Sequence, residues 1–191
     1  MILREIFEKF KGIPTTMIDG MHSEWGGDKG STHSYIDAYE ELFNPIRNKE
    51  MNFLEIGVMY GASMKMWKEY FSKGNIYGMD IRPHCTKYEE DRIKIFINDA
   101  TQKQKTEELL NTNYLLFDVI IDDGSHQIQD QLDTLGILYN YLNEGGIYII
   151  EDIQDIDTQK QYFEQLGVPI EVIDLRQIKN RYDDVLIVIK K

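Results

Sequence analysis

Residues 117–126 read Phe-Asp-Val-Ile-Ile-Asp-Asp-Gly-Ser-His, an apolar run that leads into an acidic pair, a Gly-Ser turn and a histidine. A short run dense in Ile, Val and aromatic residues is typical of a strand that is buried on both faces. A second such run, Gly146–Glu151, also ends in an acidic pair, formed by Glu151 and Asp152. In a doubly wound sheet these two runs would be parallel neighbours, about 5 Å apart. We therefore expect the two acidic pairs to lie close together at the carboxyl edge of one sheet.

Strand-like and helix-like runs alternate through the chain from residue 52 onward. The other strand-like runs are Phe53–Gly57, Asn75–Asp80 and Ile93–Ile97, and the helical stretches are Ser63–Phe71, Gln104–Leu110 and Ile128–Leu142. This alternation favours a parallel sheet with right-handed crossovers. The last two runs, Val168–Leu175 and Asp184–Lys190, are separated by too few residues for a crossover helix, so we expect a hairpin there. The sequence predicts an α/β fold with a Rossmann-like seven-stranded, mostly parallel sheet and one antiparallel strand near the C-terminus.

The length of 191 residues is within the range of one domain, and 42% apolar with 28% charged residues is typical of a globular protein. We expect a single domain over residues 1–191, with an N-terminal cap and lid segment at 1–50 and a Rossmann-like core at 51–191. Helical spacing in the first segment is found at Ile2–Phe10 and Tyr35–Phe43. Between them, Met17–His33 is polar and rich in glycine, which leaves two interpretations open, an active-site lid and a plain surface connection.

Acidic side chains outnumber basic ones, 33 against 21, which gives a net charge of −12. Such a surface repels phosphate backbones and anionic lipids, so neither nucleic acid nor a membrane is an expected partner. The single cysteine, Cys85, excludes an internal disulfide and a cysteine-based zinc site. The chain starts with a charged segment, unlike a signal peptide, and its longest nearly apolar run is too short to cross a bilayer. A reducing, cytoplasmic setting is therefore expected.

Small or acidic residues follow three consecutive strands at the same edge of the predicted sheet. Gly57 and Gly61 follow the first strand, where glycine lets the backbone turn and approach a ligand. Asp80 ends the second strand, 23 residues after Gly57, where a carboxylate can reach the ribose hydroxyls of a bound nucleoside. Asp99 and Ala100 follow the third strand. Each is also a common turn residue, but together they predict a nucleoside-containing cofactor at this edge.

Four carboxylates end the fourth and fifth strands, those of Asp122, Asp123, Glu151 and Asp152. Because like charges repel, such a group must either take up protons or share a cation. Oxygen ligands without a thiolate favour Mg²⁺ first, then Mn²⁺ or Ca²⁺. The alternative interpretation is a solvated acidic rim. His126 would face the same cleft and is a candidate general base, although a lone histidine is also commonly structural.

A seven-stranded sheet with an antiparallel member resembles that of the class I S-adenosylmethionine (SAM) methyltransferases. More specific motifs are Asp28-Lys29-Gly30 with His33 and Tyr35, Glu55-x-Gly57, Asp122-Asp123-Gly124-Ser125-His126, and Glu151-Asp152. Over roughly residues 26–155 these motifs resemble the Mg²⁺-dependent sugar O-methyltransferases of the macrocin and mycinamicin type. One departure is Glu151, where an Asp is equally expected. The resemblance implies SAM as the methyl donor, S-adenosylhomocysteine (SAH) as the product, and Mg²⁺ or Mn²⁺ as the metal.

The resemblance also implies a role for each of these residues. The expected metal ligands are Asp123, Glu151 and Asp152. The expected catalytic residues are His126, as the base, and Asp123. The expected cofactor contacts are Lys29, Ser31, Glu55, Gly57, Gly61, Asp80, Asp99, Ala100 and Asp122. The expected acceptor contacts are Trp25, His33 and Tyr35, and the segment from Asp28 to Tyr35 would close over both ligands.

The chemistry of methyl transfer agrees with these residues. An alcohol hydroxyl is a poor nucleophile at pH 7, and a base as weak as histidine cannot deprotonate it fully beforehand. A divalent cation that binds the hydroxyl lowers its pKa, so that His126 can take the proton as the methyl group moves. A second, adjacent hydroxyl would chelate the same ion and fix the orientation. The expected acceptor is therefore a vicinal diol, a sugar or a catechol.

Three other functions stay open from the sequence. A catechol or phenol O-methyltransferase shares the fold and the metal chemistry, but its acceptor pocket should be apolar. The polar stretch at His22–Glu24, followed by Trp25, which can stack on a sugar face, favours a sugar instead. A nicotinamide-dependent oxidoreductase is disfavoured because G-x-G-x-x-G is missing, and the third alternative is a SAM-binding module without activity.

The kind of acceptor also stays open, since a free sugar, a nucleotide sugar and a glycan all offer hydroxyls. The roughly 50 residues ahead of the first strand are too few for the auxiliary domain that some relatives carry. Because that domain helps assembly and substrate choice, a homo-oligomer is an open expectation here.

Overall fold

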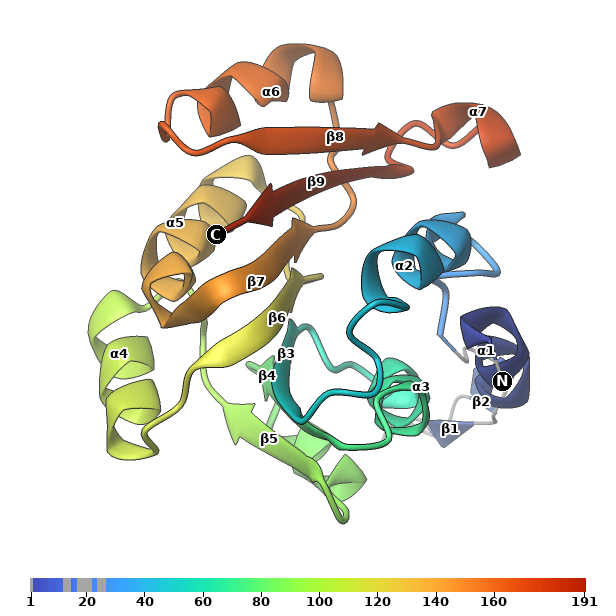
Figure 1. Ribbon diagram of the computed structural model, residues 1–191, viewed down its shortest axis with the longest axis vertical. Coiled ribbons are helices and arrows are strands. Elements are labelled where there is room, and N and C mark those ends of the chain that lie inside the picture. The colour runs from blue at the N-terminus through green and yellow to red at the C-terminus, as the bar shows by residue number, and fades with distance from the viewer. Residues whose placement is uncertain (1, 12–14, 17–21, 24–26) are drawn as a thin grey trace.

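The computed structural model describes residues 2–11, 15–16, 22–23 and 27–191, and its centre is a seven-stranded sheet (Figure 1). The order of the strands across the sheet is β5-β4-β3-β6-β7-β9-β8. Their bounds are β3 (Met51–Ile56), β4 (Gly74–Asp80), β5 (Ile93–Ile97), β6 (Phe117–Asp122), β7 (Leu142–Ile150), β8 (Ile170–Asp174) and β9 (Val185–Lys190). Strand β9 is antiparallel to both of its neighbours, β7 and β8, and the other pairs are parallel. The predicted fold class is therefore confirmed.

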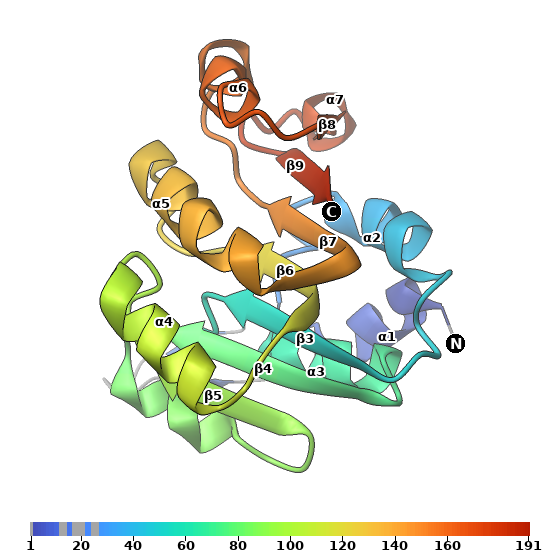
Figure 2. The same ribbon diagram turned by 60° about the vertical axis from the view of Figure 1, so that its left-hand side comes forward.

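Helices cover both faces of this sheet (Figure 1, Figure 2). The helices are α1 (Leu3–Phe10), α2 (Tyr35–Phe43), α3 (Ala62–Tyr70), α4 (Lys103–Thr112), α5 (Ile128–Leu138), α6 (Ile156–Glu164) and α7 (Arg176–Lys179), with 3₁₀ turns η1 (Pro83–Tyr88) and η2 (Tyr139–Tyr141). Two short strands, β1 (Thr15–Thr16) and β2 (His22–Ser23), pair separately. α1, α2 and α3 lie on one face of the sheet, and α4 and α5 on the other. Among the described residues, no helix has both the length and the apolar character that spanning a bilayer requires.

Alternate residues of β3 pack into two hydrophobic cores, one on each face of the sheet. Phe53 is fully buried, and its ring meets those of Trp67 and Phe71 at 5.2 and 5.4 Å between centroids. Leu54, the next residue, is buried in the opposite core with Leu135 of α5. An apolar strand covered on both faces is what the sequence predicts for this sheet. The two packed layers hold the carboxyl edge of the sheet in place.

The ends of three central strands meet at that edge. In the register of the sheet, Asp122 at the end of β6 lies opposite Ile56 of β3 and Ile150 of β7. The backbone continues this ladder, because the N–H of Asp123 donates to the carbonyl of Ile56 and the N–H of Glu151 to the carbonyl of Asp122, both at 3.0 Å. The residues that follow the neighbouring strands β3, β6 and β7 are thereby placed side by side.

The secondary structure departs from the prediction at the end of one helix and in several elements that are not predicted, among them α6 and α7. The helix expected over Ile128–Leu142 ends four residues early, because Leu142 pairs with Phe117 and begins β7. Helix α6 is not predicted, although its start carries a local signal. The side chain of Asp155 accepts a hydrogen bond from the backbone N–H of Thr158 and caps the helix.

Part of the expected lid segment lies outside the described residues. Of Met17–His33, the structure describes residues 22–23 and 27–33. Trp25, an expected acceptor contact, lies outside them. The lid interpretation and the division at residue 50 stay predictions.

Candidate active site

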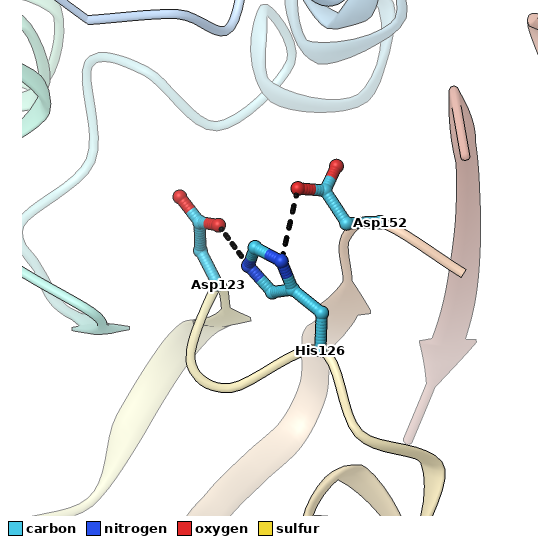
Figure 3. Close-up of side chains that lie close together, drawn as sticks. All are labelled: Asp123, His126 and Asp152. Atoms are coloured by element: carbon cyan, nitrogen blue, oxygen red, sulfur yellow. Dashed lines mark hydrogen bonds and ion pairs between the residues drawn. The ribbon is translucent and has the colours of Figure 1, made fainter. Parts of the chain in front are cut away.

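A histidine lies between two carboxylates at the carboxyl edge of the sheet (Figure 3). His126 follows β6, and its Nε2 is 3.1 Å from Oδ1 of Asp123. Its Nδ1 is 3.4 Å from Oδ2 of Asp152, which follows β7. The acidic ends of the two strands are therefore close together, and the imidazole bridges them.

The turns that carry this histidine and its partner have an unusual backbone. His126 and Asp152 have φ angles of 59° and 55°, in the left-handed region. Residues other than glycine are uncommon in this region, and such positions are enriched at functional sites. The hydroxyl of Ser125 accepts a hydrogen bond from the backbone N–H of Gln127 at 3.2 Å, and Gln127 is the N-cap of α5. The turn after β6 is therefore anchored at the helix start.

Two groups of three side chains among the described residues bring potential metal-ligand atoms within 4.8 Å of one another. The outer group is Asp123, His126 and Asp152, and the inner group is Glu55, Asp123 and Glu151. Asp123 belongs to both groups. The expected ligands Asp123, Glu151 and Asp152 are thus brought together but are divided between the two groups. Their carboxylate oxygens suit a hard cation such as Mg²⁺.

The inner group surrounds a buried ammonium group. Lys29 is 1% exposed, and its Nζ lies 2.7 Å from Asp123, 2.5 Å from Glu151 and 3.1 Å from Glu55. The hydroxyl of Tyr39 donates to Oε1 of Glu151, the same oxygen that Lys29 contacts. Lys29, an expected cofactor contact, therefore pairs with acids at the ends of three neighbouring strands.

Burial and neighbouring charges set the protonation of the acids. Burial, followed by the charge of Asp123, raises the pKa of Glu151 well above its usual range and also raises that of Asp152. Burial acts in the same direction on Asp123, but Lys29 and His126 outweigh it and hold the pKa of Asp123 below its usual range. Burial lowers the pKa of His126, but the hydrogen bond and charge of Asp123 outweigh it and raise that pKa. Asp123 is therefore the acid of the site that stays ionised most readily.

Two buried side chains, those of Tyr35 and His33, contact the carboxylate of Asp152. The hydroxyl of Tyr35 lies 2.6 Å from Oδ1 of Asp152, and its ring stacks on that of His33 at 4.7 Å between centroids. Nδ1 of His33 is 3.3 Å from Oδ1 of Asp152 and 3.3 Å from Oδ1 of Asp184. Both Tyr35 and His33, the expected acceptor contacts, are buried. In this arrangement they contact Asp152, and their contact with an acceptor stays a prediction.

Asp183 and Asp184 are site residues that the sequence reasoning missed. Both are buried, and Asp184 accepts the backbone N–H of Ser34 while the carbonyl of Asp183 lies 3.1 Å from the hydroxyl of Tyr35. Because β9 is antiparallel, its first residue, Val185, lies at the carboxyl edge of its parallel neighbours. An acidic pair directly before the last apolar run was therefore the available signal.

Two cavities share Gly57 and Asp80 in their walls. The acidic cavity, of about 270 Å³, is lined by residues that include Lys29, Asp123 and His126. The β4–β5 cavity, of about 440 Å³, is lined by residues that include Asp99, Ala100 and Asp122. A larger hollow of about 590 Å³ lies at the opposite, amino ends of β3 and β4, away from these residues. A ligand at the carboxyl edge can extend from one of the two adjoining cavities into the other.

Gly57 brings the ends of β3 and β6 into close contact. Its φ is +90°, and a Cβ atom there would lie 1.9 Å from the carbonyl oxygen of Asp123. The carboxylate of Asp80 fastens the same turn, because its Oδ2 accepts the backbone N–H groups of Val58 and Met59 at 2.9 and 3.0 Å. Asp80 therefore lines both cavities and holds the glycine turn, and its contact with ribose stays a prediction.

Two buried side-chain oxygens of the β4–β5 cavity have no hydrogen-bond partner among the described residues. They are Oδ2 of Asp122 and Oε1 of Gln131, whose residues are 3% and 2% exposed. Burial, the largest cause, raises the pKa of Asp122 to about 7. An unpartnered buried acceptor is costly, and a ligand that donates hydrogen bonds would satisfy it. Gln131 is thus a candidate that sequence reasoning missed, since a glutamine inside a helix carries no signal of its own.

The remaining expected cofactor residues lie near these cavities but do not line them. Glu55 is fully buried and accepts a hydrogen bond of 2.7 Å from the hydroxyl of Ser63. Ser31 donates its hydroxyl to the carbonyl of Gly27 at 3.2 Å. Gly61 directly precedes α3. Their contact with a cofactor stays a prediction.

Comparison with solved structures identifies the fold. The MycE methyltransferase from the mycinamycin biosynthetic pathway, solved in complex with Mg and SAH, matches with a TM-score of 0.77 and 24% sequence identity. The match covers 100% of this chain and 55% of that chain. The chain has the class I methyltransferase fold.

In sequence, this methyltransferase-fold chain resembles sugar O-methyltransferases of the macrocin and mycinamicin type. The 8-demethyl-8-alpha-L-rhamnosyl tetracenomycin-C 2'-O-methyltransferase of Streptomyces olivaceus is 34% identical over 142 residues, 71% of this chain and 37% of that protein. The demethylmacrocin O-methyltransferase of Streptomyces fradiae is 32% identical over 173 residues, 81% of this chain and 43% of that protein. The chain thus spans less than half the length of these curated relatives. No protein-family model matches it.

Proposed function

We propose that the protein transfers a methyl group from SAM to a hydroxyl of a sugar, in a reaction that depends on a divalent metal. The observation that carries the proposal is His126, which lies between Asp123 and Asp152 and lines the acidic cavity beside Gly57. A candidate base, candidate metal ligands and a candidate donor cavity thus occur together. The names of the relatives, which are sugar O-methyltransferases, support the same reaction class.

The two adjoining cavities fit an elongated nucleoside cofactor such as SAM. Gly57 leaves room where a side chain would collide with the backbone of Asp123. In the β4–β5 cavity, the unpartnered oxygens of Asp122 and Gln131 offer acceptors for the amino groups of a ligand. We propose that Asp80 and Asp99 also contact the cofactor and that SAH leaves as the product.

The acids at the strand ends fit a divalent cation, because they offer carboxylate oxygens as ligands and follow two neighbouring strands, β6 and β7. We propose that Asp123, Glu151 and Asp152 hold Mg²⁺, for which Mn²⁺ can substitute. The cation would supply Lewis acidity that lowers the pKa of an acceptor hydroxyl. His126 would take the proton of that hydroxyl, and Asp152, whose Oδ2 lies 3.4 Å from Nδ1, would stabilise the imidazolium that forms.

The sugar acceptor is favoured over a catechol because the acidic cavity has charged and polar residues in its wall, among them Lys29, Asp123 and His126. The name of the Streptomyces olivaceus relative gives a rhamnosyl tetracenomycin, a sugar-bearing molecule, as its acceptor, and a similar acceptor is proposed here. A homo-oligomer, a cytoplasmic location and the absence of nucleic-acid and membrane partners stay predictions from the sequence.

The proposal is tested by product analysis with labelled SAM against a panel of deoxysugar acceptors, with and without Mg²⁺. EDTA should abolish methylation and Mg²⁺ should restore it. His126→Ala should lower turnover by about 10²- to 10⁴-fold, the usual contribution of a general base, while SAM still binds. His84→Ala is the matched control, because His84 lies in η1 outside the acidic site. Full methylation by His126→Ala would refute the base, and indifference to EDTA would refute the metal.

A further inference from the structure

We propose that Lys29 is a positioning residue, which holds the acids Asp123 and Glu151 by one oxygen each and so fixes the orientation of both carboxylates toward the metal. This inference rests on the proposed function, because it assigns Lys29 a role toward the same metal ligands. Lys29 would contact no reacting atom.

The contacts of Lys29 separate the two oxygens of each acid. Nζ binds Oδ2 of Asp123 at 2.7 Å, whereas Oδ1 of Asp123 faces Nε2 of His126 at 3.1 Å. Nζ binds Oε1 of Glu151 at 2.5 Å, and the hydroxyl of Tyr39 donates to the same atom. Lys29, with Tyr39 of α2 at Glu151, thus binds one oxygen of each acid and fixes the orientation of the carboxylate. The third contact, at 3.1 Å to Glu55, links this pair to β3.

The backbone around Lys29 delivers the ammonium group to a fixed place. The carbonyl of Asp28 accepts the N–H groups of Ser31, Thr32 and His33 at 3.1, 3.0 and 2.9 Å, and the carbonyl of Lys29 accepts the N–H of Tyr35 at 2.9 Å. This compact turn leads directly into α2, so the side chain starts from a rigid base.

The far side of the turn is fastened as well. Nζ of Lys179 lies within hydrogen-bond distance of the carbonyl oxygens of Gly30, Ser31 and His33, at 2.8, 2.9 and 2.5 Å. The turn that carries Lys29 is therefore held between the acidic site and the segment that leads into β9. Groups that are ordered before a ligand arrives reduce the cost of ordering them on binding.

Two possible physical roles of Lys29 predict opposite effects of its removal on metal affinity. If the ammonium group acted only as a charge, it would repel a dication a few ångströms away, and its removal would strengthen metal binding. If it orients the ligands, its removal would let Asp123 and Glu151 turn apart and would weaken metal binding. Partners that orient metal ligands are commonly worth about 10- to 100-fold in metal affinity.

The test is a titration of the chain with Mn²⁺, followed by electron paramagnetic resonance, in the absence of SAM and acceptor. The variants are Lys29→Met and the double variant Lys29→Met with Glu55→Gln. The double variant removes one positive and one negative buried charge, so the net charge of the cluster stays as in the wild type. The variant therefore avoids most of the cost of leaving an unpaired charge buried. Glu55→Gln alone is the reference for the double variant, because it keeps the contacts of Lys29 to Asp123 and Glu151 and carries the same change at Glu55, a member of the inner group. Circular dichroism checks the fold of each variant.

We expect the double variant to bind Mn²⁺ about 10- to 100-fold more weakly than Glu55→Gln, from which it differs only at Lys29. If the folded double variant binds Mn²⁺ as tightly as Glu55→Gln or more tightly, the role of Lys29 is overturned. Asp152→Asn separates this failure from a failure of the proposed function. If the wild type binds no Mn²⁺, or if Asp152→Asn binds it equally well, the proposed metal site fails and the role of Lys29 fails with it.

Discussion

Replacing Gly57 with alanine is expected to lower the free energy of unfolding by about 2–5 kcal/mol. A left-handed φ of +90° costs a residue with a Cβ atom about 1–2 kcal/mol. The new Cβ atom would also lie 1.9 Å from the carbonyl oxygen of Asp123, so the ends of β3 and β6 would have to separate by about 1 Å. Forcing extra volume into a packed region costs about 1–3 kcal/mol more.

Two other glycines separate these contributions. Gly167 has a φ of +74° and nothing within 4 Å of an added Cβ atom, so Gly167→Ala should cost only the backbone strain, about 1–2 kcal/mol. Gly136 lies inside α5 with open space around an added Cβ atom, so Gly136→Ala should raise the free energy of unfolding by about 0.5–1 kcal/mol. Urea unfolding followed by circular dichroism measures all three variants. If Gly57→Ala costs no more than Gly167→Ala, the close contact between Gly57 and Asp123 is wrong.

Three further predictions concern residues outside the reacting centre. Arg92 donates to three backbone carbonyls around the C-terminal end of α3. Arg92→Met should therefore lower the free energy of unfolding in urea by about 2 kcal/mol. Lys94→Met, at an exposed side chain, is the control and should change that free energy little. Lys179 binds three carbonyls but is exposed, so Lys179→Met should lower the free energy of unfolding in urea by only about 1 kcal/mol. Lys160→Met, at another exposed lysine, is the control. If Lys179→Met has no larger effect than this control, Lys179 does not fasten the turn. Cys85 is fully buried, and burial raises the pKa of its thiol to about 12. A disulfide reagent at pH 8 should therefore label Cys85 only after the chain unfolds. Rapid labelling of the folded chain would contradict this burial.

The sheet was predictable because its strands are short apolar runs with clear ends. The bounds of β5 agree with the prediction, since Ile93–Ile97 is flanked by Arg92 and Asn98, and β6 ends as predicted at Asp122, the first residue of the acidic pair. The boundary between α5 and β7 was not predictable. Residues 139–142 continue an apolar pattern, and only the pairing of Leu142 with a distant strand shows where the helix must stop.

The candidate site was predictable in part for the same reason. Asp123, His126 and Asp152 follow directly on recognisable strands, and parallel strands bring their ends to one edge. The contacts of Lys29 join it to acids 94 and 122 residues further along the chain, and no local pattern encodes such a pairing. Asp183 and Asp184 required one more step, the direction of β9, which places the start of that strand among the ends of the others.

The position of β9 has a consequence for synthesis of the chain on the ribosome. β9 lies between β7 and β8, although it follows both in sequence, so neither strand has its native partner on that side until Val185–Lys190 has emerged. Until then a nascent chain exposes the unpaired backbone of β7, an edge that invites pairing with other chains. A ribosome that stalls before Val185 would therefore leave an aggregation-prone intermediate, and chaperones that shield strand edges should matter most for this protein in that interval.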